Sequence, residues 1–453
     1  MHKLNIHNLT GEAKLNRFHG LVLLWCFLIL VLDGYDLAVV GAALPSIMKE
    51  MGVNAAKAGF MASSALFGMM FGAIFFGTLA DKFGRPKMMA ICVAIFSIFT
   101  AAAGMTIDPV SFSLARFIAG LGIGGVLPIA TAQVAEFAPV SIRARLVAVM
   151  LAGYAVGGML VAVLGKQLIE TYGWQSVFYA AGLPVLLIPF ILKTMPESMP
   201  FLIRKNRDAD LRNIVRKLVP SYPLHEQAQF MVPVSDKADD TPIAHLFREG
   251  RGFSTVMIWA AFFFGLFMLY ALSSWLTKLM ALAGYSLGSA LNFVLVYNIG
   301  AIVGAFAGAW LGDKLNIKYA LVAFYALGAV SLTAMGYTKS TELLFVMVFI
   351  VGASTLGTQL IAYGYAAEFY PMAIRSTGVG FASGVGRTGA IVAPILIGGL
   401  VALKLPLEQN FMAIGLAGLL GMIAVILINH GLCASAPHKN AATEAVLGHS
   451  EKV

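Results

Sequence analysis

The sequence predicts an all-α polytopic membrane protein with twelve spanning helices in two pseudo-symmetric six-helix bundles. Three observations predict this fold class. Apolar side chains make up 59% of the 453 residues and charged side chains only 12%, about half the charged fraction of soluble domains. The apolar residues gather into twelve long runs, and short motifs of the first half recur in the second half at one constant spacing. This composition nearly excludes a soluble enzyme and also excludes a disordered chain.

The apolar runs fall into two sets of six. A bilayer core of ~30 Å requires about 20 apolar residues per helix. The first set covers 21–43, 58–80, 88–107, 111–133, 146–166 and 177–194. The second set covers 254–276, 290–311, 319–337, 342–363, 377–401 and 411–431. Because the runs are continuous rather than alternating, they favour helices over a β-barrel.

A polar stretch separates the two sets and divides the chain into three parts. Residues 195–252 are rich in arginine, lysine and proline, which is typical of a cytoplasmic linker with some interfacial helix. We therefore expect an N-terminal six-helix bundle in 1–194, this linker, and a C-terminal bundle with a short cytoplasmic tail in 253–453.

The distribution of basic residues predicts the orientation in the membrane. If both termini and the linker are cytoplasmic, 23 of the 31 lysine and arginine residues lie in inner segments. Only six lie in outer loops, namely Lys49, Lys57, Lys166, Lys278, Lys339 and Lys404. Cytoplasmic loops collect such residues, so both termini are predicted to be inside. The net charge of +9 is then explained by topology and does not indicate nucleic-acid binding.

The sequence contains no constellation typical of an enzyme. Cys26, Cys92 and Cys433 are isolated within apolar runs and form no CxxC pair, so they predict neither a disulfide framework nor a metal site. No nucleophile–base pair and no set of metal ligands is visible. We expect no catalytic residues, no metal and no cofactor.

The two halves share an internal repeat. Ala135-Glu136-Phe137-Ala138-Pro139 matches Ala367-Glu368-Phe369-Tyr370-Pro371. The spacing that relates Glu136 to Glu368 also relates Asp81-Lys82 to Asp313-Lys314, Gly68 to Gly300 and Gly72 to Gly304. Parallel repeats of this kind are typical of transporters that rock one half against the other. The paired glycines are interpreted mainly as close helix contacts.

Two motifs resemble the major facilitator superfamily. Residues 77–87 read Gly-Thr-Leu-Ala-Asp-Lys-Phe-Gly-Arg-Pro-Lys, similar to the superfamily's G-x-L-x-D-[RK]-x-G-R-x-[RK] signature between its second and third helices. The segment from Arg116 to Gly122 is similar to its R-x-x-x-G-x-G pattern. The resemblance covers the whole chain and implies the major facilitator fold, with alternating access.

A narrower resemblance begins in the first span. Asp33-Gly34-Tyr35-Asp36 is similar to the D-G-x-D motif of the aromatic acid:proton symporters, and the segments around Glu368 and Arg387 also resemble that family. The chain most resembles the benzoate and 4-hydroxybenzoate permeases. Pro196-Glu197-Ser198 resembles the P-E-S-P-R stop of sugar porters, but Met199-Pro200 departs from it, which weakens a sugar-porter interpretation.

Asp33, Asp36 and Arg116 are predicted to couple transport to protons. Carboxylates within a spanning helix are costly and are usually functional. Three residues apart, the two aspartates share nearly one helix face, and close carboxylates tend to share a proton. The resemblance implies that Arg116 takes part opposite them. The alternative is structural, in which one aspartate pairs with an arginine or caps a kink at Gly34.

Five residues are predicted to bind substrate: Arg387, Tyr35, Asn298, Phe267 and Tyr270. The planar guanidinium of Arg387 suits a carboxylate, although a buried structural ion pair is the alternative for both in-span arginines. Aromatic side chains would stack on a ring substrate, although any one of them could serve packing instead.

A charge network is predicted at the cytoplasmic helix ends. Its members are Asp81, Arg85, Glu136 and Arg143 in the first half, and Asp313, Glu368 and Arg375 in the second. We interpret it as an inward gate that forms in one conformation and breaks in the other. Static anchoring of the loops is the alternative.

Together these features predict a monomeric importer of an aromatic carboxylate, driven by proton symport across the bacterial inner membrane. The partners expected are the substrate, protons and the lipid bilayer. Three alternatives remain: a carrier of a non-aromatic organic acid such as muconate, a proton-coupled exporter of drugs or metabolites, and a receptor that binds aromatics without transport.

Overall fold

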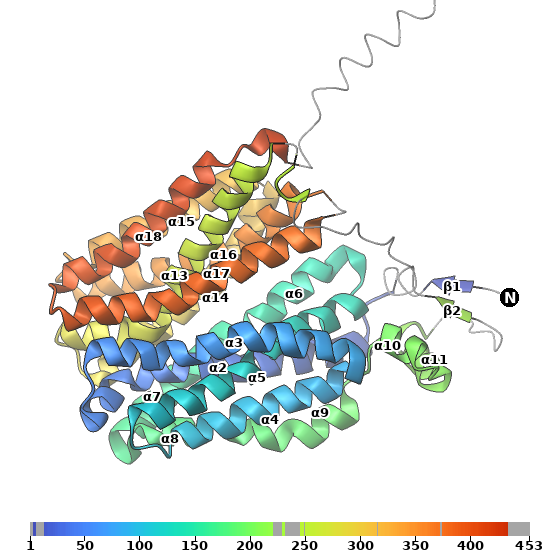
Figure 1. Ribbon diagram of the computed structural model, residues 1–453, viewed down its shortest axis with the longest axis horizontal. Helices are drawn as coiled ribbons and strands as arrows, with labels where there is room; N and C mark the ends of the chain where they lie inside the picture. The colour runs from blue at the N-terminus through green and yellow to red at the C-terminus, as the bar shows by residue number, and fades with distance from the viewer. Residues whose placement is uncertain are drawn as a thin grey trace, which may run out of the picture.

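The computed structural model describes residues 3–5, 13–220, 229–231, 245–248, 250–314, 316–371 and 374–433. Within these residues, twelve helices are long and apolar enough to cross a membrane. The predicted all-α membrane fold is confirmed. Figure 1 shows the helices gathered into two bundles, one blue to green and one yellow to red.

The first bundle contains six spans. They are α2 (Arg17–Met51), α3 (Ala55–Phe83), α4 (Arg85–Ala103), α5 (Pro109–Phe137), the pair α6 (Arg143–Leu151) and α7 (Gly153–Tyr172), and a sixth span formed by α8 (Gln175–Ala180), η2 (Leu183–Leu187) and α9 (Ile188–Thr194). The short η1 (Val140–Ile142) precedes α6. The sixth span is interrupted at η2, whose second residue is Pro184, because proline supplies no backbone N–H.

The second bundle repeats the first. Its spans are α13 (Gly252–Leu282), α14 (Leu287–Lys314), α15 (Ile317–Met335), α16 (Thr341–Phe369), α17 (Arg375–Ala402) and α18 (Leu407–Leu427), followed by η3 (His430–Leu432). Most helices extend beyond the predicted apolar runs, because their polar ends continue past the bilayer core. For example, α2 continues to Met51 and ends at Gly52, whose φ of 62° is left-handed.

Local sequence explains several helix starts. The side chain of Asn16 accepts hydrogen bonds from the backbone N–H groups of Phe18 and His19 and so caps α2. Asp108 caps α5 in the same way through Val110 and Ser111, with Pro109 in the first turn. These bonds hold the pKa of the Asp108 carboxyl below its usual range.

The glycine repeat is a packing feature in both halves. A Cβ on Gly68 would collide with the carbonyl of Phe117, and one on Gly72 with that of Leu121. In the second half, Gly300 meets Phe349 and Gly304 meets Ala353 in the same manner. Each partner is related to its counterpart by the spacing of the internal repeat, so the α3–α5 and α14–α16 contacts are equivalent.

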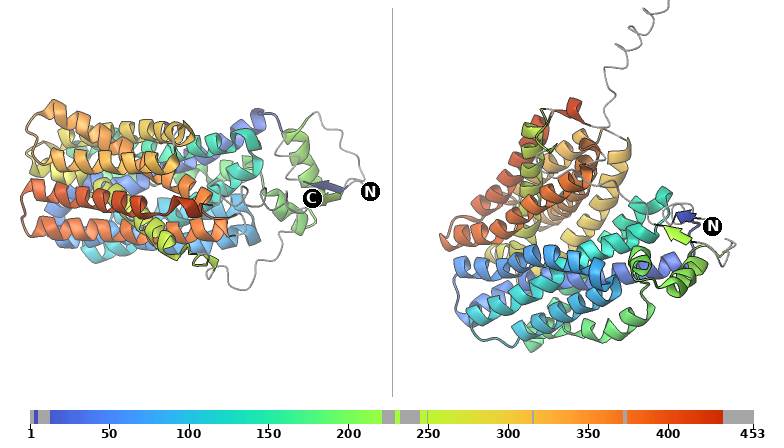
Figure 2. Two further views of the ribbon diagram at one scale, coloured as in Figure 1. Left: turned by 90° about the horizontal axis from the view of Figure 1, so that it is seen from above. Right: turned by 45° about the vertical axis from the view of Figure 1, so that its right-hand side comes forward.

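Beyond the spans, the described residues of the linker form two short helices and a strand. α10 (Met199–Arg204) and α11 (Asp208–Leu218) lie at the end of the first bundle, as Figure 2 shows. β2 (Gln229–Met231) pairs in parallel with β1 (Lys3–Asn5). Asn16 also donates two hydrogen bonds to the carbonyls of Lys217 and Leu218 at the end of α11. The predicted C-terminal tail after Cys433 lies outside the described residues.

The two bundles meet through α3 with α17, α7 with α14, and α2 with α13. Between the halves, Ser63 Oγ donates to the carbonyl of Ile391 at 2.8 Å, and Lys166 Nζ contacts Asn292 Oδ1 at 3.4 Å. Gly59 packs on the carbonyl of Pro394. All these contacts lie in the half of the molecule distant from α10 and α11. In Figure 1 the bundles diverge toward the end that carries those two helices.

Candidate functional site

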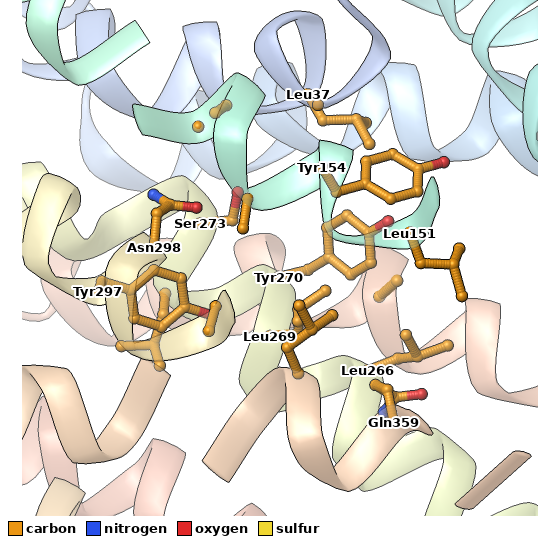
Figure 3. Close-up of a pocket in the computed structure, with 18 of the residues that line it drawn as sticks. Leu37, Leu151, Tyr154, Leu266, Leu269, Tyr270, Ser273, Tyr297, Asn298 and Gln359 are labelled. Carbon is orange, nitrogen blue, oxygen red and sulfur yellow. The ribbon is translucent and has the colours of Figure 1, made fainter. Parts of the chain in front are cut away.

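A cavity of ≈ 190 Å³ lies between the two bundles, near the middle of the spanning helices. Residues of α2, α3, α5, α6, α7, α13, α14, α16 and α17 line it. The volume is below the ~300–1,000 Å³ of sites for drug-sized ligands, so it suits a small molecule. Figure 3 shows side chains from both halves converging on this space.

The two walls of the cavity differ in chemistry. The first bundle contributes mainly apolar groups, including Leu37, Leu66 and Leu127, and Tyr154 supplies its one hydroxyl among the described lining residues. The second bundle contributes most of the polar side chains: Tyr270, Ser273, Tyr297, Asn298, Gln359, Tyr363, Ser383 and Arg387. A ligand with an apolar body and a polar head would find a surface for each.

Arg387 is the only charged residue that lines the cavity in the described part of the chain. Its guanidinium makes no hydrogen bond and no ion pair with any described residue. It lies close enough to Asp33, Tyr154 and Tyr270 to interact with them electrostatically. An arginine with free donors can bind a carboxylate in bidentate fashion.

The two aspartates of α2 have different surroundings. Asp36 accepts a hydrogen bond at 2.9 Å from Arg116 Nη1, and the side chains of both residues are only 1% exposed. Arg116 also donates to Thr100 Oγ1 at 2.6 Å and to the backbone carbonyl of Asp36 at 3.0 Å. The charge of Asp36 is therefore compensated by a buried cation.

Asp33 has no such cation within ion-pair distance. It is fully buried, and its Oδ2 accepts a hydrogen bond of 2.6 Å from Tyr154 Oη, while Oδ1 has no partner among the described residues. Gly34 lets α2 approach α7, because a Cβ there would collide with the backbone of Tyr154. Asp33 itself does not line the cavity, whereas Tyr154 does.

The structure brings only some of the predicted substrate residues to the cavity. Arg387, Tyr270 and Asn298 line it, whereas Tyr35 and Phe267 do not. Tyr35 Oη donates to the carbonyl of Val177 at 2.9 Å within the first bundle. Phe267 is 5% exposed, and its ring is stacked with that of Phe263 at a centroid distance of 6.5 Å.

Sequence reasoning missed other lining residues, above all Tyr154 and Gln359. Figure 3 shows Tyr154 and Tyr270 side by side, with their hydroxyls pointing the same way. Gln359 is 5% exposed, and neither atom of its amide has a partner among the described residues. Tyr363 Oη and Ser383 Oγ form a hydrogen bond of 2.7 Å across α16 and α17. No sequence signal marks these positions, since single tyrosines and glutamines carry no motif and the contacts that place them arise from helix packing.

The predicted charge network is partly assembled in the first half. Arg85 forms an ion pair with Glu136, and its backbone N–H donates to Glu197 Oε1 at 2.8 Å. Glu136 also accepts from Ser198 Oγ at 3.0 Å and from the backbone N–H of Met199 at 2.6 Å. Burial raises the pKa of the Glu197 carboxyl above its usual value. The linker segment 197–199 is thereby fixed against α4 and α5.

The other network residues stay apart from this cluster. Asp81 is exposed and contributes only its backbone carbonyl, to Arg204 Nη2 at 2.8 Å. Arg143 donates to the carbonyl of Ala138 and Arg375 to that of Tyr370, both at 3.4 Å. These two contacts are related by the internal repeat. Glu368 is exposed, and the side chain of Asp313 lies outside the described part of the structure.

The fold and the central cavity define a membrane transporter built from two six-helix halves. The family model described as "Major Facilitator Superfamily" matches residues 26–394. The benzoate transport protein of Acinetobacter baylyi is 41% identical over 433 residues, which are 94% of this chain and 93% of that protein. The chain therefore belongs to the major facilitator superfamily, and it is not an enzyme.

Further relatives are also transporters of aromatic acids. The 4-hydroxybenzoate transporter PcaK of Pseudomonas putida is 32% identical, covering 94% of this chain and 97% of its own. The gallate transporter of Pseudomonas putida is 31% identical, covering 96% and 97%. The predicted resemblance to the aromatic acid:proton symporter family is confirmed.

Solved structures share the fold at lower identity. The xylose transporter XylE of Escherichia coli in a partially occluded inward-open conformation has a TM-score of 0.69 at 18% identity, covering 94% of this chain and 99% of that one. A bacterial homolog of the human lysosomal transporter Spinster, in an inward-facing conformation, has a TM-score of 0.70 at 18% identity, covering 94% and 100%. At this identity the likeness supports the fold alone.

Proposed function

We propose that this protein imports an aromatic carboxylate of the benzoate or hydroxybenzoate type by proton symport with alternating access. The proposal rests on the position of Arg387. This cation has no partner among the described residues and lines a cavity whose other described lining residues are uncharged. The benzoate and hydroxybenzoate transporters among the relatives support the substrate class.

Substrate recognition follows from the asymmetry of the cavity walls. The carboxylate of the substrate binds the guanidinium of Arg387 through charge-assisted hydrogen bonds. The ring lies against the leucines of the first bundle and the rings of Tyr270 and Tyr154, where aromatic contacts are favourable. Polar groups such as Asn298 and Gln359 are available for hydroxyl substituents on the ring. Tyr35 and Phe267 would support the helices around the cavity without touching substrate.

The proton is carried by Asp33. An ionised carboxylate buried without a cation is costly, and a proton on Asp33 removes that cost. Asp36 keeps its charge because Arg116 compensates it. The ion pair between Asp36 and Arg116 thereby fixes α2 against α5, and it stays charged while Asp33 gains and loses its proton.

Proton and anion binding support each other. The positive charge of Arg387 disfavours a proton on nearby Asp33, and a bound carboxylate neutralises that charge. Anion binding therefore favours protonation, and by linkage protonation favours anion binding to the same extent. Asp33, Arg387 and the substrate together carry no net charge once both the proton and the anion are bound. Closing this site away from water therefore costs less than closing a site that holds the anion without the proton.

The conformation described here corresponds to the inward-facing state of this cycle. This assignment rests on both termini being cytoplasmic, as the excess of inner lysine and arginine indicates. The contacts between the bundles, such as Ser63 with Ile391, then seal the periplasmic end. The cluster of Arg85 and Glu136 stays within the first bundle in this state. We propose that it faces Glu368, Arg375 and Asp313 when the cytoplasmic end closes.

The protein resides in the bacterial inner membrane and works as a monomer. Both walls of the cavity come from one chain, so a single copy contains a complete site. The system for testing the proposal is the purified protein in proteoliposomes with an alkaline interior. Radiolabelled benzoate should enter these vesicles faster than it enters protein-free vesicles under the same pH gradient. Protein-free vesicles correct for passive entry of neutral benzoic acid.

The substrate proposal fails if neither benzoate nor hydroxybenzoates enter faster than in the protein-free control. Unlabelled muconate should compete poorly, because it lacks a ring to fill the apolar wall. Strong competition by muconate together with weak competition by hydroxybenzoates would instead indicate a carrier of non-aromatic acids.

A further inference from the structure

Tyr154 occupies a position between the buried carboxyl of Asp33 and the cavity. Its hydroxyl is the only one that the first bundle contributes to the cavity lining in the described residues. The same hydroxyl donates the 2.6 Å hydrogen bond to Asp33 Oδ2. One side chain therefore contacts both the substrate space and the carboxyl.

Asp33 has no other polar route to the cavity within the described part of the chain. It is 0% exposed and is absent from the cavity lining, and its second oxygen has no partner there. The backbones of Gly34 and Tyr154 are in direct contact, which fixes the distance between α2 and α7 at this level. Cys92, whose thiol interacts electrostatically with Asp33, is also buried.

We propose that Tyr154 relays the proton between the cavity and Asp33; this inference rests on the proton symport proposed above. A hydronium ion in the cavity gives a proton to Oη as the hydroxyl's own proton passes to Oδ2 of Asp33. One O–H bond breaks and one forms at Oη, so the tyrosine ends unchanged and Asp33 gains one proton. On the cytoplasmic side the steps run in reverse, with water as the acceptor.

The surroundings of Tyr154 also link this relay to the substrate. Arg387 interacts electrostatically with both Tyr154 and Asp33, and Tyr270 lies beside Tyr154 from the opposite bundle. A carboxylate bound to Arg387 would therefore sit next to the relaying hydroxyl. Transfer of a proton to Asp33 is then favoured when the anion is bound, so that proton and anion load together, as symport requires.

The test compares Tyr154→Phe with the wild-type protein in two assays on the same proteoliposomes. The first is benzoate accumulation driven by an imposed pH gradient, which requires Asp33 to gain and lose a proton. The second is counterflow, in which internal unlabelled benzoate exchanges for external labelled benzoate at equal pH. Counterflow needs only the loaded carrier to reorient, so it does not require deprotonation.

We expect Tyr154→Phe to lower gradient-driven uptake on the order of 10²-fold, as for the loss of a positioned proton-transfer group. Counterflow should fall far less, because phenylalanine keeps the ring that contacts the substrate. Tyr325→Phe is the matched control. Tyr325 is a buried tyrosine whose hydroxyl donates to the carbonyl of Ala261 and does not line the cavity. It should preserve both activities.

Two results would overturn the relay. The first is gradient-driven uptake by Tyr154→Phe at the wild-type rate and with the wild-type pH profile. The second is an equal loss of uptake and counterflow, which would assign Tyr154 to substrate binding or to packing. Failure of the wild-type protein itself to accumulate benzoate would instead contradict the proposed function, so the two failures are distinguishable.

Discussion

The two arginines inside the membrane spans should respond differently to the same substitution. Arg387 has no partner among the described residues, so Arg387→Gln removes a ligand contact without leaving a buried charge unpaired. Charge-assisted hydrogen bonds contribute about 1.5–3 kcal/mol each. Losing two of them at the low end costs ~3 kcal/mol, which weakens benzoate binding on the order of 10²-fold.

Arg387→Lys separates charge from geometry. Lysine keeps the positive charge but cannot form the planar two-pronged contact. We expect it to lose about one of the two bonds, or ~1.5 kcal/mol, and so to weaken binding by roughly tenfold.

Arg116→Gln is the opposite case. It leaves Asp36 buried without its cation, and breaking a buried pair costs about 3–5 kcal/mol of stability. The assays are isothermal titration with benzoate and thermal unfolding of the ligand-free protein in detergent. Arg387→Gln should lose affinity and keep its Tm, whereas Arg116→Gln should lower Tm. If Arg387→Gln lowers Tm as much as Arg116→Gln does and leaves affinity unchanged, Arg387 is structural and the recognition proposal is refuted.

Three further predictions address the proton site, the outer closure and the cavity amide. Asp33→Asn should abolish gradient-driven uptake and retain counterflow, whereas Asp36→Asn should lose uptake together with thermal stability; uptake by both variants would refute the proton site. Gly59→Val should collide with Pro394 and so favour the outward-facing state. The assay is labelling of an Ala38→Cys probe by an impermeant maleimide added outside, in a protein without the native cysteines, and the labelling should become faster. Unchanged labelling would show that the contact of Gly59 with Pro394 does not hold the periplasmic end closed. Gln359→Leu should raise the Tm of the ligand-free protein, because an unpaired buried amide costs about 1–3 kcal/mol. The same substitution should weaken the binding of hydroxybenzoates more than that of benzoate. A lower Tm would indicate that the amide is paired.

Much of the fold follows from the sequence because bilayer physics restricts it. Apolar runs of sufficient length must be helices, and the constant spacing of the repeated motifs relates the two halves before any coordinates are known. The glycine contacts of Gly68 and Gly300 follow from the same repeat. The break at Pro184 and the pairing of β1 with β2 were not predicted, because each depends on local geometry that hydropathy does not encode.

The site was less accessible to sequence reasoning. Arg116 and Arg387 look alike as charges within apolar runs, and only the packing of α2 against α5 distinguishes the paired arginine from the free one. Tyr154 is one of 14 tyrosines and belongs to no motif. Its proximity to Asp33 arises from the close approach of α2 and α7 at Gly34, a contact between segments that are far apart in the sequence.

Proton symport requires that a proton enter with the aromatic carboxylate through this protein. The most direct measurement is the internal pH of proteoliposomes containing a trapped pH dye, recorded when benzoate is added outside at equal pH and zero membrane potential. Vesicles carrying Asp33→Asn and protein-free vesicles account for passive entry of benzoic acid. We expect faster internal acidification with the wild-type protein than with either control. Internal alkalinisation, or acidification no faster than in the controls while labelled benzoate still enters through the protein, would contradict it.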